Sequence, residues 1–263
     1  MKHILLAALA LLIFLTVTPD PLRISPDSEV YLSAAASFRA GRGFLRPEGT
    51  PLTILPPLTS ILLAFIPARL LNATGFATTV LLSERLLARM VPSRPLYMAG
   101  LVLVLLADPL HYVYGWVWSE SVFIPLVLAV FVLLPHVDQP RALIAAAVCT
   151  ALAMLTRYSG VTLFAVAALA VAWTRRKRGW FGLAALGTYG FVAALPLALW
   201  LARNAALGET IGNRARPPIW DLPTALADTA RTLVGWPGRD ALLLPVLLLA
   251  IMEIRRRWAL LRR

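Results

Sequence analysis

The stretch Ile4-Leu-Leu-Ala-Ala-Leu-Ala-Leu-Leu-Ile-Phe-Leu-Thr-Val17 contains no charged residue, and similar apolar runs recur along the whole chain. Such runs are typical of membrane-spanning helices, because a helix satisfies its own backbone N–H and C=O groups inside the lipid. The strands of a closed barrel would alternate in polarity, and these runs do not alternate. We therefore expect an all-α fold, a polytopic helical membrane protein with a single integral-membrane domain over residues 1–263.

The apolar runs set the number and limits of the expected spans. We expect about eight spans, at residues 3–18, 53–71, 96–114, 119–135, 142–156, 158–173, 181–202 and 240–254. The first run resembles a signal peptide, but no small-x-small cleavage site follows it, so we expect an uncleaved helix. Segment 76–91 is amphipathic in its second half, and we expect it to lie in the membrane interface.

Composition agrees with this class. The hydrophobic share of the 263 residues is 59%, and only 14% are charged, against about 25% in soluble domains. The net charge of +12 would indicate nucleic-acid binding in a soluble protein. In a membrane protein it indicates cytoplasmic loops rich in Lys and Arg, so we expect membrane lipids and no nucleic acid as partners.

Two basic clusters fix the expected orientation. Arg175-Arg176-Lys177-Arg178 and Arg255-Arg256-Arg257 each follow an apolar run directly. The positive-inside rule then places both termini in the cytoplasm of a multi-pass protein of the plasma (inner) membrane. The same topology puts Arg69 and the Asn72-Ala73-Thr74 triplet on the cytoplasmic side.

Most acidic residues fall on the opposite side. Under this topology only Glu84, Asp138 and Glu253 are cytoplasmic. Arginines accompany the remaining carboxylates on the outer face. Mixed charge gathered on one face of a membrane protein indicates a polar cavity that opens there.

The first outer loop, residues 19–52, contains the acidic pair Asp27 and Glu29. Residues 28–40 favour a helix along the membrane interface, with Ser25 or Asp27 as its N-cap and Gly41 near its end. Asp27 then acts either as a cap alone, worth about 1 kcal/mol, or in chemistry. Two carboxylates at this spacing can share a divalent cation, or can divide the roles of base and orienting group.

Ionisable residues near later spans reach the same side. Arg157 lies between two apolar stretches joined by almost no loop, so it needs an anionic partner. A phosphate suits a guanidinium well, and Glu120 is the alternative as a structural counter-ion. Arg203 ends a span, where it can also simply reach toward the headgroups. The outer loop 204–239 is either a cover for a cavity or an ordinary connection.

Several short motifs occur in a recognisable order. They are Asp27-Ser-Glu29-x-Tyr31, Gly41-Arg-Gly43-Phe44, Leu55-Pro-Pro57-Leu58, Ser119-Glu120, Leu155-Thr-Arg157-Tyr158-Ser-Gly160 and Trp200-x-x-Arg203-Asn204. Over roughly residues 1–216 this ordered set resembles the GT-C superfamily of integral-membrane glycosyltransferases. The nearest likeness is to its bacterial branch of protein mannosyltransferases and aminoarabinose transferases.

The resemblance implies an enzyme at the outer face of the plasma membrane. It would move a sugar from a polyprenyl-phosphate-linked donor to a lipid, glycan or protein acceptor, and direct displacement would invert the anomeric centre. Asp27 would be the general base, and Glu29 would orient it or join it in binding Mg²⁺ or Mn²⁺. Arg157 and Arg203 would hold the donor phosphate. The further site candidates are Tyr31, Glu120, Tyr158 and Asn204.

The chain also departs from this family. Its relatives usually have more spans and often a soluble C-terminal domain, and region 72–95 is shortened where they have another helix pair. We therefore expect a shortened member. Two other classes fit the same features: a transporter or lipid-binding protein whose charges line a substrate path, and a catalytically inactive scaffold for envelope assembly.

Overall fold

The computed structural model describes residues 2–208, 223–224 and 226–227. This part of the chain is helical and contains no strand beyond two isolated bridges, which confirms the all-α prediction. The expected span 240–254 and most of the loop 204–239 lie outside the described residues. The α-helices are α1 (Lys2–Val17), α2 (Pro26–Arg39), α3 (Leu58–Phe65), α4 (Ala68–Met90), α5 (Arg94–Leu106), α6 (Asp108–Tyr114), α7 (Glu120–Leu133), α8 (Pro140–Thr156), α9 (Gly160–Arg175) and α10 (Trp180–Ala206), and the 3₁₀ turns are η1 (Leu134–His136) and η2 (Arg176–Arg178).

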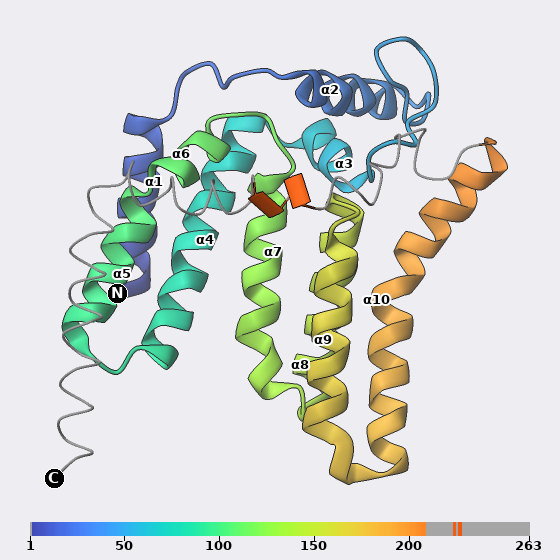
Figure 1. Ribbon diagram of the computed structural model, residues 1–263. Coiled ribbons are helices and arrows are strands. Elements are labelled where there is room, and N and C mark those ends of the chain that lie inside the picture. Colours follow the sequence, from blue (N-terminus) through green and yellow to red (C-terminus); the bar gives the residue numbers. More distant parts are fainter. Residues whose placement is uncertain (1, 209–222, 225, 228–263) are drawn as a thin grey trace, which may run out of the picture.

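Most of the long helices run up and down beside one another (Figure 1). α4 packs between α1 and α7, and α8 contacts α7, α9 and α10. α2 and α3 lie across one end of this bundle, which we call the α2 end. The opposite end, which carries η1 and η2, is called the η end.

Two helical segments are long and apolar enough to cross a membrane. They are Arg94–Tyr114, which joins α5 and α6, and Trp180–Ala206. A third is reached if α3 and α4 count as one broken span. The other apolar helices, such as α1 with 16 residues and α8 with 17, are shorter than the roughly 20 residues of a perpendicular span. Within the described residues, the structure therefore supports two or three spans by length and composition, and the predicted set of eight is not confirmed.

The expected span 53–71 is wrong as a single helix. α3 ends at Phe65 and α4 begins at Ala68, and the two helices meet at 117°. Pro67 causes the break, because proline lacks an N–H donor and drives the residue before it out of the helical region. Ile66 accordingly has φ −118° and ψ 125°.

The break moves the neighbouring residues from their predicted places. Segment 76–91, expected in the interface, is instead the second half of α4 and packs along α1 and α7. Arg69 at the start of α4 donates to the Pro19 carbonyl at 2.9 Å and pairs with Asp20 at 3.3 Å. Arg69 therefore lies at the α2 end, opposite the basic η2, and the prediction that both lie on one side is wrong.

A glycine allows α4 and α7 to approach closely. A Cβ atom at Gly75 would lie 2.2 Å from the Ser121 carbonyl oxygen, which is backbone and cannot swing away. Asn72, one turn earlier, donates to the carbonyls of Tyr114 and Trp116 at 2.8 and 2.7 Å. Small residues at such crossings are typical of helix contacts in membranes.

We expect Gly75→Ala to destabilise the bundle by about 1–3 kcal/mol, the usual cost of overpacking. The matched control is Gly187→Ala in α10, where an added Cβ meets open space and helix propensity favours alanine by about 1 kcal/mol. Thermal unfolding of the two purified variants in detergent would measure the difference. A Gly75→Ala protein that melts at or above the wild-type temperature would show that the helices do not meet this closely.

Candidate active site

The helix α2 starts and ends where local sequence rules place its limits. Ser25 Oγ accepts from the Ser28 N–H at 3.2 Å, and Ser28 Oγ accepts from the Ser25 N–H at 3.0 Å, which forms a capping box. Gly41, with φ 74°, follows the helix and allows the chain to turn away. The interface helix expected at residues 28–40 is thus present as a helix, and Asp27 lies in its first turn.

The segment before α2 is fastened to the connection between α6 and α7. Arg23 donates its N–H to the Gly115 carbonyl at 2.9 Å, and its own carbonyl accepts from the Val117 N–H at 3.1 Å. Trp118 Nε1 donates to Ser25 Oγ at 2.7 Å, so a side chain next to α7 holds the cap of α2. These bonds fix the first turn of α2 beside the start of α7.

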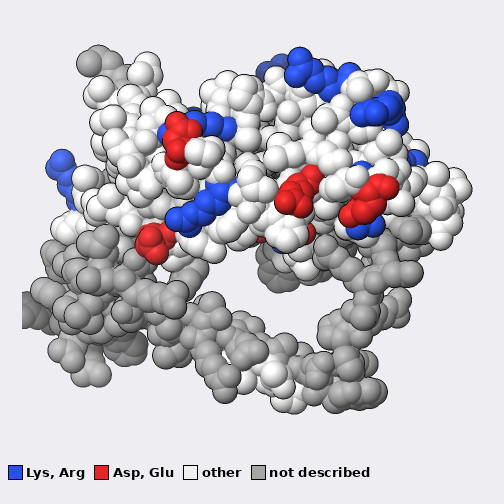
Figure 2. Space-filling view, turned by 90° about the horizontal axis from the view of Figure 1, so that it is seen from above, with Lys and Arg blue, Asp and Glu red and all other residues white. Residues whose placement is uncertain are grey.

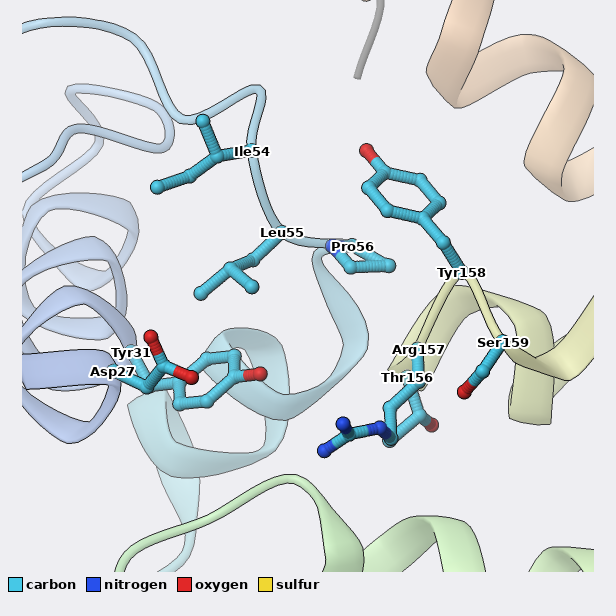
Figure 3. A pocket seen from close by; sticks show the side chains of 9 residues that line it. All are labelled: Asp27, Tyr31, Ile54, Leu55, Pro56, Thr156, Arg157, Tyr158 and Ser159. Atoms are coloured by element: carbon cyan, nitrogen blue, oxygen red, sulfur yellow. The ribbon is translucent and has the colours of Figure 1, made fainter. Parts of the chain in front are cut away.

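A cavity of about 160 Å³ lies at the α2 end where three separate segments meet. Figure 3 shows Asp27 and Tyr31 of α2 on one side, the 54–56 segment on another, and the turn between α8 and α9 facing them. The lining residues are Asp27, Tyr31, Ile54, Leu55, Pro56, Thr156, Arg157, Tyr158 and Ser159. A carboxylate and a guanidinium from distant parts of the chain thus line one cavity.

Arg157 is held from behind by the start of α7. Its Nη1 forms an ion pair with Glu120 and donates to Ser119 Oγ at 3.0 Å. The side chain of Arg157 remains 38% exposed, and that of Glu120 is 26% exposed. A phosphate and Glu120 were the two partners considered for Arg157, and the structure shows the pair with Glu120.

The turn that carries Arg157 is tight. α8 ends at Thr156, and Arg157 has the extended φ of −148°. A Cβ atom at Gly160 would lie 2.7 Å from the backbone nitrogen of Met154, so only glycine lets α9 begin this close to α8. The tight turn presents the side chains of residues 157–159 to the cavity.

Tyr31 brings a protonated hydroxyl to the cavity. The residue is only 3% exposed, and this burial raises the pKa of its phenol. A hydrogen bond with Ser119 and the positive charge of Arg157 act in the opposite direction and do not outweigh burial. At neutral pH the phenol is therefore neutral and can donate a hydrogen bond to a ligand oxygen.

A clamp formed by Tyr158, Arg203 and Asn204 holds the wall of the cavity. Arg203 Nη1 donates to the Leu52 carbonyl at 2.6 Å, and Tyr158 donates to the Thr53 carbonyl at 2.8 Å. Asn204 Nδ2 reaches the same Thr53 carbonyl at 3.3 Å. The clamp joins the end of α10 to the segment that continues directly into the lining residues 54–56.

Trp200 completes the support from α10. The guanidinium of Arg203 lies 4.5 Å from the centre of its ring, and Trp200 Nε1 donates to the Tyr158 hydroxyl at 3.2 Å. Phe44 packs edge-on against the same ring at 5.6 Å. The side chain of Arg203 is thus oriented both by the hydrogen bonds of Nη1 and by the Trp200 ring.

The predicted site residues other than Glu29 fall into three groups. Asp27, Tyr31, Arg157 and Tyr158 line the cavity, and Glu120 contacts Arg157 from behind. Arg203 and Asn204 lie at the same end but bind the backbone of residues 52–53. This role of Leu52 and Thr53 was not predicted, because the residue types do not reveal which backbone carbonyl accepts a side-chain hydrogen bond.

Glu29 does not join Asp27 at the cavity. It is exposed and is not a lining residue, and side chains two apart in a helix point about 200° apart. Among the described residues, no three or more His, Cys, Asp or Glu side chains gather to hold a metal ion. Asp27 and Glu29 are therefore not placed to share the expected Mg²⁺ or Mn²⁺ ion.

The surface of the α2 end carries both signs of charge. Seen from above in Figure 2, acidic and basic side chains lie interspersed over this face. The ion pairs Arg69–Asp20 and Arg46–Glu48 belong to it, and their partners are 3.3 and 3.5 Å apart. The mixed charge predicted for one face of the protein is present at this end.

Comparison of the chain with protein families, with curated proteins and with solved structures gave no match.

We expect the double substitution Arg203→Met with Asn204→Ala to loosen the cavity wall. Losing hydrogen bonds of about 1 kcal/mol or more each should speed amide exchange of residues 44–55 by about tenfold or more. Hydrogen–deuterium exchange with mass spectrometry on the full chain would measure it. Arg176→Met at the exposed η2 turn is the control and should leave this segment unchanged. Unaltered exchange in the double variant would show that the clamp does not hold the wall.

Proposed function

We propose that this chain is a glycosyltransferase of the GT-C type that transfers a sugar from a polyprenyl-phosphate-linked donor. The observation that carries the proposal is the cavity in which Asp27 and Arg157 face the same space. A base for a hydroxyl and a cation for a phosphate are the two groups that this reaction needs. The order of motifs along the chain supports the same class.

The position of the cavity suits a lipid-linked donor. It lies at the end of a bundle of apolar helices, so the prenyl chain can stay in the membrane while the phosphate reaches the end of the bundle. In the proposed topology the α2 end faces outward from the plasma membrane, both termini are cytoplasmic, and the remaining expected spans complete a multi-pass protein. The acceptor hydroxyl, from a lipid, glycan or protein, then enters from the outer side.

The proposed reaction is a direct displacement. The Asp27 carboxylate accepts the proton of the acceptor hydroxyl while that oxygen attacks the anomeric carbon of the sugar. The bond from this carbon to the phosphate oxygen breaks, and its electron pair leaves with the prenyl phosphate. Attack opposite the leaving group inverts the anomeric configuration.

Two further residues assist the departing phosphate. The guanidinium of Arg157 stabilises the charge that grows on the leaving oxygen. The neutral hydroxyl of Tyr31, which lines the same cavity, donates a hydrogen bond to a phosphate or sugar oxygen. No step runs through Glu29 or a metal ion, because Asp27 and Glu29 are not placed to share one.

Arg203 has a supporting role in this proposal. Its bonds to the Leu52 carbonyl and to Asn204, at 2.6 and 2.9 Å, keep the cavity wall in place. The resemblance assigns it to the donor phosphate, and that role stays a prediction.

A second candidate function is lipid binding or transport. An apolar groove of about 540 Å³ lies between α4, α5, α6 and α7, bordered by residues such as Val104, Leu110 and Ile124. Such a groove accepts an acyl or prenyl chain without any chemistry. Flux of a labelled lipid across vesicles with no transfer product would favour this class.

The direct test uses the purified full chain in lipid vesicles with a panel of polyprenyl-phosphate sugars and short glycan, lipid and peptide acceptors. A transferred sugar and free polyprenyl phosphate in equal amounts would support the proposal. No transfer and no donor hydrolysis from any member of a broad panel would leave the scaffold or transport alternatives.

We expect Asp27→Asn to lower turnover by about 10²- to 10⁴-fold, the usual contribution of a general base. Donor binding should persist, because the phosphate contacts lie on Arg157. The matched control is Asp20→Asn, an exposed carboxylate at the same end that pairs with Arg69, which should keep wild-type turnover. An Asp27→Asn enzyme with normal turnover would remove Asp27 from the proposed role.

A further inference from the structure

The charge balance around Arg157 is unusual for a phosphate site. Arg157 is the one Lys or Arg among the described residues that line the cavity. Glu120 neutralises it from behind, and Asp27 adds a second negative charge to the lining. With the ion pair intact, these three groups sum to a charge of −1.

The two lipid phosphates of the proposed reaction differ in charge. The sugar donor is a phosphate diester and carries one negative charge. The leaving polyprenyl phosphate is a monoester, which carries about −1.5 to −2 at pH 7 because its second pKa is about 6. The negative charge of Glu120 is present in both states, so it acts differently on the substrate and on the product.

We infer that Glu120 is a specificity-determining residue that disfavours the dianionic product relative to the monoanionic donor and so promotes product release. This inference rests on the proposed function. Glu120 itself is not a lining residue, so it acts through Arg157 and through the field at the cavity. Glu120 forms an ion pair with Arg157, and Ser119 contacts both side chains. The carboxylate of Glu120 therefore lies close enough to repel a phosphate bound at Arg157.

The size of the effect follows from the ligand charge. Coulomb energy is proportional to that charge. Removing the charge of Glu120 therefore improves the binding free energy of a dianion by twice as much as that of a monoanion. For partly exposed groups we expect about fivefold for each unit of ligand charge. The ratio of monoester to diester affinity should then rise by about fivefold. A residue that merely orients Arg157 would change both affinities by the same factor.

The test measures binding of two probes to the full chain in lipid nanodiscs. They are geranyl phosphate and its methyl diester, which share the prenyl chain and differ by one ionisable oxygen. The variants are Glu120→Gln, Glu120→Asp, which keeps the charge, and Arg157→Met. Glu48→Gln is the control, because it makes the same charge change at an exposed site paired with Arg46. The pH is held well above the second pKa of the monoester, about 6.

We expect the monoester-to-diester affinity ratio to rise about fivefold in Glu120→Gln and to stay unchanged in Glu120→Asp and Glu48→Gln. Arg157→Met should weaken both probes. An unchanged ratio in a folded Glu120→Gln protein overturns the inference and leaves the proposed function standing. A wild type that binds the monoester much more tightly than the diester also overturns it, even if the Glu120→Gln variant does not fold. A wild type that binds neither probe rejects the donor class itself, and the inference falls with it.

Discussion

The cavity depends on the hydrogen bonding of a short irregular segment at the end of an apolar bundle. Leu52 and Thr53 are buried, at 0% and 2% exposure, and lie outside any helix. A buried carbonyl without a partner costs free energy comparable to a lost hydrogen bond, so such a segment survives only where side chains reach it. Those side chains come from Tyr158 and from the last turns of α10, more than a hundred residues later. The wall of the cavity is therefore a product of the whole bundle.

The charged groups at the site also need partners. An arginine beside apolar helices is costly unless it is paired, and a partner of the right geometry offsets that cost. Glu120 takes this part for Arg157, while Ser119 bonds the same guanidinium. Both contacts are made by one nitrogen, Nη1. They orient the guanidinium of Arg157 from the side that faces away from the cavity. Structural support and the proposed phosphate binding are thus separate duties of one side chain.

The sequence predicted helix type better than helix limits. Apolar runs identify the bundle, and Ser25 with Gly41 frames α2, because capping and turn chemistry are local. The apolar run at 53–71 conceals the break at Pro67, since hydropathy does not respond to backbone geometry. Asp27 and Glu29 read as a pair in the sequence and separate on a helix, where their spacing turns them to different sides. The clamp on Leu52 and Thr53 was beyond prediction, because it is a contact between side chains and distant backbone.

The quoted sequence motifs all lie at one end of the helix bundle. An up-and-down bundle has two ends, and motifs without a common role would fall at both. The quoted motifs instead fall on α2 and the segment after it, on the start of α3, on the start of α7, on the turn between α8 and α9, and on the end of α10, all at the α2 end. At the η end the buried carboxylate of Glu84 is engaged by Lys2 and Tyr97, each at 2.7 Å. In the described part of the chain, the α2 end is thus where an exposed carboxylate, that of Asp27, borders a cavity. The α2 end is therefore the place that the proposed reaction would use.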